Sequence, residues 1–144
     1  MDTKEIVSFL HKVPILKGLN NRQLESLSKL AYEREYTPGN IIVKQGEGGI
    51  GLFIVVSGHA EAVRERQDGA QVVVNHFGPT DFFGELALLD EGQRTASVIA
   101  REPTKCLGIL RWDFLGMLKT DADMSVIVLQ ELGRRFRSLL EASM

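Results

Sequence analysis

Cysteine is nearly absent from this sequence, which contains a single one, Cys106, among 144 residues. One cysteine cannot form an internal disulfide, and it excludes zinc or iron–sulfur sites built from four cysteines. Because Cys106 lies in a segment that alternates like a strand, we expect a buried structural thiol. A chain of this length can bury one core without disulfides or a metal.

Long apolar runs, a strong charge of one sign and linker-like stretches are also missing. The net charge is −2, whereas a general nucleic-acid binder usually carries a basic patch and a high pI. The charged start of the chain is followed by no apolar run of signal or membrane-span length. No repeat or Pro/Gly/Ser-rich tract separates two domains. We therefore expect a cytoplasmic protein of one domain (1–144) that binds neither nucleic acid nor membrane.

Metal-binding and catalytic patterns are not recognisable either. The three histidines, His11, His59 and His76, lie far apart in the sequence, and we find no cysteine or carboxylate at ligand spacing from them. No serine lies in a nucleophile elbow or beside a candidate base. The sequence therefore predicts no metal site, no cofactor and no enzyme.

What the sequence does contain is helix, then strand, then helix. Residues 4–12 and 20–32 have helical periodicity, and Asn20 with Gln23 forms a capping box at the second start. Thr120 is the predicted cap of a long final helix. Glycine-punctuated runs rich in Ile, Val and Phe predict the strands 41–43, 52–56, 60–66, 71–77, 96–100 and 104–110. We expect an α+β, mainly β fold: a β-sandwich or jelly roll over 36–111, with Asp68-Gly69 as a hairpin turn and helices over 1–35 and 112–144.

The stretch 83–98 carries the chemistry that best suggests a function. A helix that begins after Gly84 would direct free N–H groups and the positive end of its dipole at an anion. Arg94 can grip two phosphate oxygens at once. Glu85 would be repelled by a phosphate unless it accepted hydrogen bonds from a neutral group such as a sugar hydroxyl. Gly84, Glu85 and Arg94 together predict a site for a nucleotide whose phosphate and ribose lie side by side. The alternative is that Glu85 and Arg94 form only a surface ion pair, which would contribute about 0–1 kcal/mol to stability.

This stretch resembles the phosphate-binding cassette of cyclic nucleotide-binding domains of the catabolite activator and protein kinase A regulatory subunit type. Its pattern, F-G-E-L-A-L, a spacer, then R-[TSA]-A-[TS]-V, matches without a gap over sixteen positions. The resemblance implies a double-stranded β-helix jelly roll with a C-terminal lid-helix pair. It assigns the ribose 2′-hydroxyl to Glu85 and the phosphate to Gly84, Leu86, Ala87, Arg94, Thr95 and Ala96. Gln93, where many members have proline, and Ile50, where an acidic residue is common, depart from the pattern outside the expected contacts.

The same resemblance implies a base pocket and a lid, made of Ala62, Val74, Arg135, Leu139 and Leu140. The first two would touch the purine, although at strand spacing both are equally well explained as core. The two leucines would cover the base, and Arg135 would pair with Glu85 when the lid closes. The apolar stripe of the final helix could equally face the core or form the seam of a homodimer, and an arginine near a helix end is usually solvated.

The predicted function is that of a sensor which binds a cyclic nucleotide, cAMP rather than cGMP, and signals through its final helix to an unidentified protein effector. A hydroxyl at Thr95 is often associated with cGMP in this family, but members with threonine also bind cAMP. Two alternatives stay open: an interaction module of the same fold without nucleotide, and a regulatory fragment of a larger protein. No helix-turn-helix follows the final helix, so we expect no DNA binding of the catabolite-activator kind.

Overall fold

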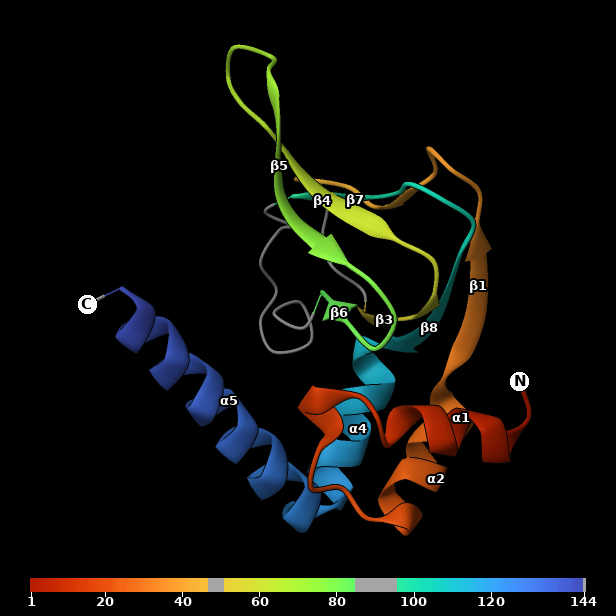
Figure 1. Cartoon of the computed structure of the whole chain (residues 1–144). Helices are drawn as coiled ribbons and strands as arrows, with labels where there is room; N and C mark the ends of the chain where they lie inside the picture. Colours follow the sequence, from red (N-terminus) through yellow and green to blue (C-terminus); the bar gives the residue numbers. More distant parts are fainter. Residues whose placement is uncertain (47–50, 85–95, 144) are drawn as a thin grey trace. The chain divides into compact units, whose positions relative to one another are not determined.

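The computed structural model of the protein describes residues 1–46, 51–84 and 96–143. Its contacts divide the chain into two compact units (Figure 1). Leu30–Asp113 form the strand unit, and Met1–Lys29 with Phe114–Met144 form the helical unit. The expected single domain over 1–144 stays a prediction.

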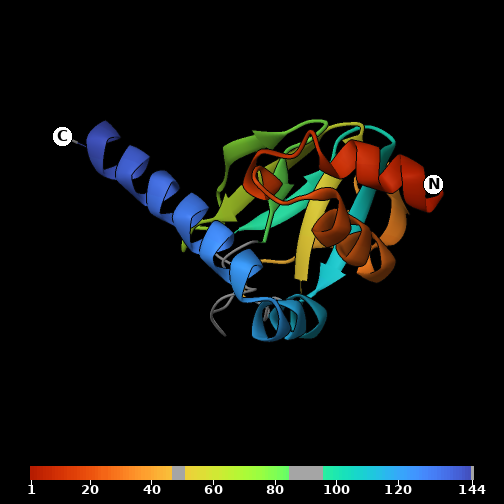
Figure 2. The ribbon, with the colours of Figure 1, turned by 90° about the horizontal axis from the view of Figure 1, so that it is seen from below.

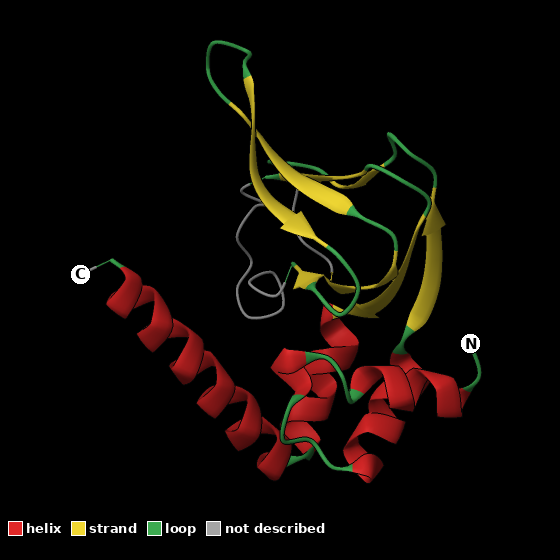
Figure 3. Ribbon diagram, in the orientation of Figure 1, coloured by secondary structure: helices red, strands yellow, loops and turns green. Residues whose placement is uncertain are grey.

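Two antiparallel sheets make up the strand unit, as Figure 3 shows in yellow. One sheet has the strand order β1-β8-β3-β6 and the other the order β2-β7-β4-β5. The strands are β1 (Tyr32–Tyr36), β2 (Ile41–Val43), β3 (Gly51–Ser57), β4 (Ala60–Glu65), β5 (Gln71–Phe77), β6 (Phe82–Phe83), β7 (Ser97–Ala100) and β8 (Thr104–Leu110). This arrangement confirms the predicted α+β, mainly β fold with a sandwich of two sheets flanked by helices.

The core of the strand unit lies between the two sheets. Side chains of both sheets form one apolar cluster: Phe53, Val55, Ala60, Ala62, Phe77, Phe83, Val98 and Cys106. The ring of Phe83 stacks on Phe53 at 5.5 Å between centroids and lies 5.1 Å from Phe77. Contacts of this kind join segments far apart in the chain, so the sheets are held as one body.

The hairpin of β4 and β5 extends beyond the rest of the strand unit (Figure 1). Its turn contains Asp68 and Gly69, and Gly69 has a φ of +85°. The backbone N–H of Ala70 donates to Oδ1 of Asp68 at 2.9 Å. The hairpin predicted from Asp68-Gly69 is therefore confirmed, because glycine supplies the positive φ and aspartate the local acceptor.

The helical elements are α1 (Thr3–Leu10), the 3₁₀ turn η1 (Pro14–Leu16), α2 (Asn21–Leu30), α4 (Arg111–Thr120) and α5 (Ala122–Ala142). Figure 2 shows α5 as one continuous helix. At the start of α2, Oδ1 of Asn20 accepts from the N–H of Gln23, and Oε1 of Gln23 accepts from the N–H of Asn20, both at 2.9 Å. The predicted capping box is confirmed. Among the described helices, none has the length and apolarity needed to cross a bilayer.

Two predicted boundaries are wrong. Helix α2 ends at Leu30, and residues 32–36, partly assigned to the N-terminal helices, form β1. Most residues of this strand are exposed, so its sequence lacks the alternation of apolar and polar residues that indicates a half-buried strand. It is a strand because it pairs in register with β8, from Tyr32 opposite Gly108 to Tyr36 opposite Thr104.

The second wrong boundary is the start of the final helix. Thr120 is the last residue of α4, where its hydroxyl donates to the carbonyl of Gly116 at 3.1 Å. The N-cap of α5 is Asp121, whose Oδ1 accepts from the N–H of Met124 at 3.0 Å. Thr and Asp both cap well, and because α4 runs through Thr120, the cap falls one residue later.

Candidate functional site

Most of the predicted phosphate- and ribose-binding residues fall outside the described residues. These are Glu85, Leu86, Ala87, Arg94 and Thr95, and the two departures Ile50 and Gln93 lie outside as well. The residues that border this part of the cassette, Gly84 and Ala96, are described. The structure therefore shows where the cassette leaves and rejoins the strand unit.

Gly84, the second residue of the cassette, has a backbone conformation that favours glycine. Its φ is +86°, in the left-handed region where a side chain costs free energy. The preceding strand β6 pairs with β3, with Phe83 opposite Phe53 and Phe82 opposite Ile54. The aromatic contacts of Phe83 thus anchor the residue from which the cassette departs.

Ala96 marks the return of the chain to the same core. It is partly buried and packs against the apolar cluster between the sheets. The next residue, Ser97, begins β7 and lies opposite Val63 of β4. Both ends of the cassette are therefore tied to one unit, as a ligand site with a fixed frame requires.

The two predicted base-pocket residues have different surroundings. Ala62 is buried in the cluster between the sheets, as its core interpretation requires. Val74 is 44% exposed, so the same interpretation does not account for it. The register explains the difference: Ala62 lies opposite Asn75 and Val63 opposite Val73, so Val74 is the extra residue of a bulge. Bulges often redirect side chains beside functional sites, and contact of either residue with a purine stays a prediction.

The apolar stripe of α5 is divided along its length. Met124 and Val128 in its first half are buried, whereas Leu139 and Leu140 are 69% and 49% exposed. The core-facing interpretation therefore holds for the first half only. Arg135 is half-buried, and its predicted pairing with Glu85 involves a residue outside the described part of the chain. The roles of Arg135, Leu139 and Leu140 stay predictions.

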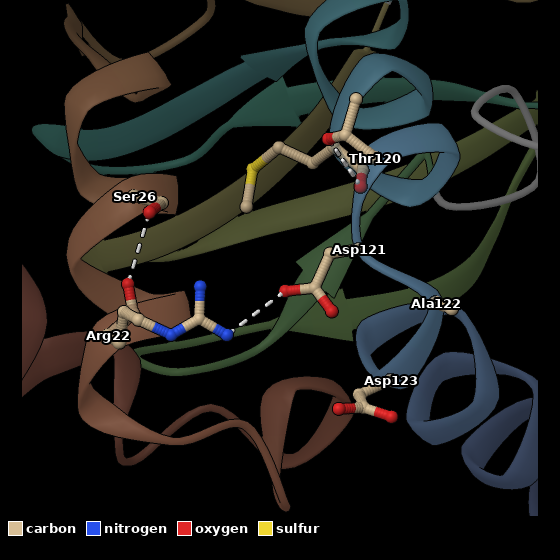
Figure 4. A pocket seen from close by; sticks show the side chains of 7 residues that line it. Arg22, Ser26, Thr120, Asp121, Ala122 and Asp123 are labelled. Carbon is tan, nitrogen blue, oxygen red and sulfur yellow. Dashed lines mark hydrogen bonds and ion pairs between the residues drawn. The ribbon is translucent and has the colours of Figure 1, made fainter.

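The helical unit contains a polar cavity of about 330 Å³ that the sequence did not suggest (Figure 4). Its lining residues are Arg22, Ser26, Met117, Thr120, Asp121, Ala122 and Asp123. The guanidinium of Arg22 lies 3.6 Å from the carboxylate of Asp121. The pKa of Asp121 is lowered chiefly by the hydrogen bond that its carboxylate accepts from the Met124 N–H. The hydrogen bond from Gln23 and the charge of Arg22 lower it further. Among the predicted nucleotide-binding residues that the structure describes, none lines this cavity.

Two of the histidines, far apart in the sequence, come together in space, and one of them, His76, meets a carboxylate. The rings of His59 and His76 stack with centroids 5.4 Å apart. Nδ1 of His76 lies 3.3 Å from Oε2 of Glu61, because Glu61 and His76 face each other across β4 and β5. Arg101 pairs with the same carboxylate at 2.6 Å. Within 1–46, 51–84 and 96–143, no group of three or more side chains is arranged to hold a metal ion, and the absence of a metal stays a prediction.

Cys106 has the environment expected of a structural thiol. It is fully buried in the core of the strand unit. Burial raises the pKa of its thiol to about 12. The prediction of a buried structural cysteine is confirmed.

Comparison with known families adds the decisive observation. The family model for the cyclic nucleotide-binding domain matches residues 33–121, more than half of the chain. The chain belongs to the cyclic nucleotide-binding domain family. The match begins within β1 and ends at Asp121, the N-cap of α5. It covers nearly the whole strand unit and leaves α5 outside.

This cyclic nucleotide-binding domain has relatives among regulatory proteins. It is 34% identical over 106 residues to the cyclic AMP receptor protein of Thermus thermophilus, covering 74% of this chain and 49% of that protein. It is 34% identical over 110 residues to a cAMP-dependent protein kinase regulatory subunit of Colletotrichum orbiculare, covering 76% of this chain and 27% of that protein. The chain thus spans about half, or less, of the length of these relatives.

A solved structure agrees with this assignment of the fold. The N-terminal domain of a transcriptional regulator from Streptomyces coelicolor A3(2) superposes on this cyclic nucleotide-binding domain with a TM-score of 0.85. The two are 26% identical, and the match covers 94% of this chain and 95% of that one. A match of this extent includes helices as well as strands.

Proposed function

We propose that this domain binds cAMP in preference to cGMP and reports the binding through α5. The observation that carries the proposal is the cassette at 83–98, which matches its pattern without a gap and is tied at both ends to the strand unit. Arg94 binds the exocyclic phosphate oxygens and Glu85 the ribose 2′-hydroxyl. The names of the two relatives, a cyclic AMP receptor protein and a cAMP-dependent kinase subunit, support cAMP as the ligand.

The remaining contacts follow the family pattern. Gly84, Leu86, Ala87, Thr95 and Ala96 complete the phosphate site. The base lies between Ala62 and Val74 on the sheet side and Leu139 and Leu140 on the helix side, with Arg135 reaching Glu85. The exposed leucines of α5 support this role, because an apolar surface without a partner gains free energy when a ligand or an effector covers it.

Calorimetric titration with cAMP and cGMP tests the ligand, with 5′-AMP as the control that lacks the cyclic phosphate. We expect Arg94→Ala to weaken binding by about 2–5 kcal/mol, roughly thirty- to several-thousand-fold, because it leaves a buried phosphate without its cation. Arg101→Ala is the matched control, since Arg101 pairs with Glu61 at 2.6 Å on the same unit and lies outside the cassette. Folded, nucleotide-free protein that gives no heat with either cyclic nucleotide would favour an interaction module without a ligand.

The role of α5 needs a separate test, because a ligand moves a helix only by its differential affinity for the two positions. Leu139→Ala combined with Leu140→Ala should weaken cyclic nucleotide binding and leave the melting temperature of the unliganded domain almost unchanged. Both side chains are largely exposed, so little core packing is lost. Unchanged affinity would refute the lid. Sedimentation of the same variant would then show whether the leucines form the seam of a homodimer.

A further inference from the structure

Strand β5 forms an open edge of the sheet β2-β7-β4-β5. It pairs with β4 on one side, and among the described residues no strand pairs with its other side. Native sheets blunt such edges with charged residues, proline or bulges, because unpaired N–H and C=O groups attract another strand. Gln71–Phe77 contain no Asp, Glu, Lys, Arg, Pro or Gly, and their middle is a run of valines. The bulge at Val74 is therefore the one protection of this kind that β5 has.

The hydrogen bonds of β4 show which backbone groups of β5 face this edge. The N–H and C=O of Glu65 bond to the side-chain amide of Gln45, at 2.8 and 3.3 Å, rather than to Gln71, which lies opposite Glu65. In the next pair, the N–H of Arg66 donates to the carbonyl of Ala70 at 2.8 Å. Hydrogen-bonded and non-hydrogen-bonded pairs alternate along an antiparallel ladder. Gln71 belongs to a non-hydrogen-bonded pair and therefore directs its own N–H and C=O away from β4.

Val73 has the same orientation as Gln71, because it stands two positions further along the ladder, opposite Val63 and before the bulge. Beyond the bulge, the N–H of His76 already donates to Oδ1 of Asn75, at 2.8 Å. The open part of the edge is therefore 71–73. It lies close to the tip of the hairpin, which extends beyond the rest of the strand unit (Figure 1), and the side chain of Val73 is 45% exposed. The strand unit itself thus leaves room for another strand beside this stretch.

We propose that β5 pairs with β5 of a second copy of this chain, antiparallel about a two-fold axis at Val72. This axis sets Gln71 of each chain opposite Val73 of the other, so every outward N–H meets a C=O of its copy. The stretch is thus complementary to itself, and the two copies of Val72 form an apolar cross-strand pair. Charges do not oppose the contact: Arg64, opposite Val72, would lie three strand spacings, about 14 Å, from its copy, beyond the screening length of about 8 Å. The pairing requires neither a nucleotide nor α5.

A cysteine at the proposed axis tests the register in the whole chain. In Val72→Cys the two copies would form a non-hydrogen-bonded pair with Cα atoms about 4.5 Å apart, within reach of a disulfide. Diamide, which takes up two electrons and two protons, should therefore link most chains into dimers on a non-reducing gel. Val74→Cys is the matched control. Val74 is 44% exposed, whereas Val72 is half-buried, so random collision would favour linkage at Val74. In the proposed register Val74 lies four ladder positions, about 13 Å, from its copy and should not link. The native Cys106 is fully buried, with a thiol pKa of about 12, and should not react.

Sedimentation equilibrium tests the backbone pairing without a cross-link. The contact is small, so we expect a weak dimer whose fraction rises with protein concentration. Val73→Pro removes an outward N–H from each chain, half of the interchain donors, and leaves the bonds to β4 in place. It should weaken association about thirtyfold or more. Val73→Ala, which keeps the N–H, should weaken association only a few-fold.

Several results would overturn the pairing of β5. One is a Val74→Cys dimer as abundant as the Val72→Cys dimer, and another is a Val73→Pro variant that associates like the wild type. A wild type that stays monomeric at every concentration, together with no cross-link in Val72→Cys, would leave the edge to an extended segment of another protein. A dimer that persists in Val73→Pro but is lost when Leu139 and Leu140 are both alanine would place the contact on α5. Should Val73→Pro not fold, the two cysteine variants decide the question. Nucleotide binding is measured separately by calorimetry, so either proposal can fail without the other.

Discussion

The strand unit and the helical unit differ in how far apart in sequence the contacts that define their strands and their helix starts lie. In the strand unit, Phe83 stacks on Phe53, and Tyr32 pairs with Gly108. In the helical unit, the helix starts depend on residues three apart, as in the box of Asn20 and Gln23. Long-range contacts must break together, whereas local ones can open singly. We therefore expect the strands to open together and each helix start to open singly, while distant contacts such as Gln23 Nε2 to Asp121 Oδ2 at 3.4 Å join the helices to one another.

The strongest test of this difference is the reactivity of Cys106. With its thiol pKa raised from 9.0 to about 12, the thiolate fraction at pH 8 should be roughly a thousandfold smaller than that of a free cysteine. Complete burial should slow the reaction further, to the rate at which the strand unit opens. Labelling with a thiol reagent, followed by mass spectrometry with and without denaturant, measures it. A thiol that reacts in native protein as fast as a free cysteine would mean that the strand unit opens readily.

Two phenylalanines offer a second comparison, one in each unit. Phe83 is 4% exposed and in contact with two other rings, whereas Phe136 on α5 is 64% exposed. Phe83→Ala should lower the free energy of unfolding by about 3–5 kcal/mol, and Phe136→Ala by about 0.5 kcal/mol or less in the unliganded protein. Denaturant unfolding followed by circular dichroism gives both values. Similar losses would indicate that the end of α5 is packed against something in solution.

Local signals in the sequence predicted local structure well. Asn20 with Gln23 gave the start of α2, and Asp68-Gly69 gave a hairpin turn, because each depends on a few adjacent residues. The strand β1 was missed because its polar residues become a strand only by pairing with β8, some seventy residues later in the sequence. The contact of His76 with Glu61 was missed for the same reason, since it depends on the register of β4 and β5.

The candidate site was predicted from a contiguous motif, which is why so much of it could be named in advance. A phosphate loop uses neighbouring backbone groups and one arginine, and these stand together in the sequence. Contacts between distant segments could not be named in the same way. The N–H of Gln45, after β2, donates to Oγ of Ser97 at the start of β7, 52 residues later in the sequence, and no spacing rule connects the two.

The capping box of α2 tests the local side of the comparison. Asn20→Ala should cost about 1 kcal/mol of stability, because the N–H of Gln23 loses its acceptor. Asn20→Ser, which keeps a capping oxygen, should cost only a fraction of that. Thermal melting by circular dichroism distinguishes the two variants. If the alanine and serine variants have the same melting temperature, another group accepts the hydrogen bond from the N–H of Gln23.

The smallest expected effect concerns the pH dependence of the α5 N-cap. The carboxylate of Asp121 accepts from the Met124 N–H, and this hydrogen bond is the main cause of its lowered pKa. A group whose pKa is lower in the folded state stabilises that state above its unfolded pKa, near 3.9, and the stabilisation is lost as the pH falls through the folded value.

Asp121→Asn keeps a capping oxygen but does not titrate. We therefore expect similar melting temperatures at pH 7 and a smaller loss for the variant below about pH 4. All other carboxylates are common to both proteins, so the difference between the two curves reports Asp121 alone. Parallel curves would show that the cap does not depend on the charge, and that the start of α5 is held by its neighbours.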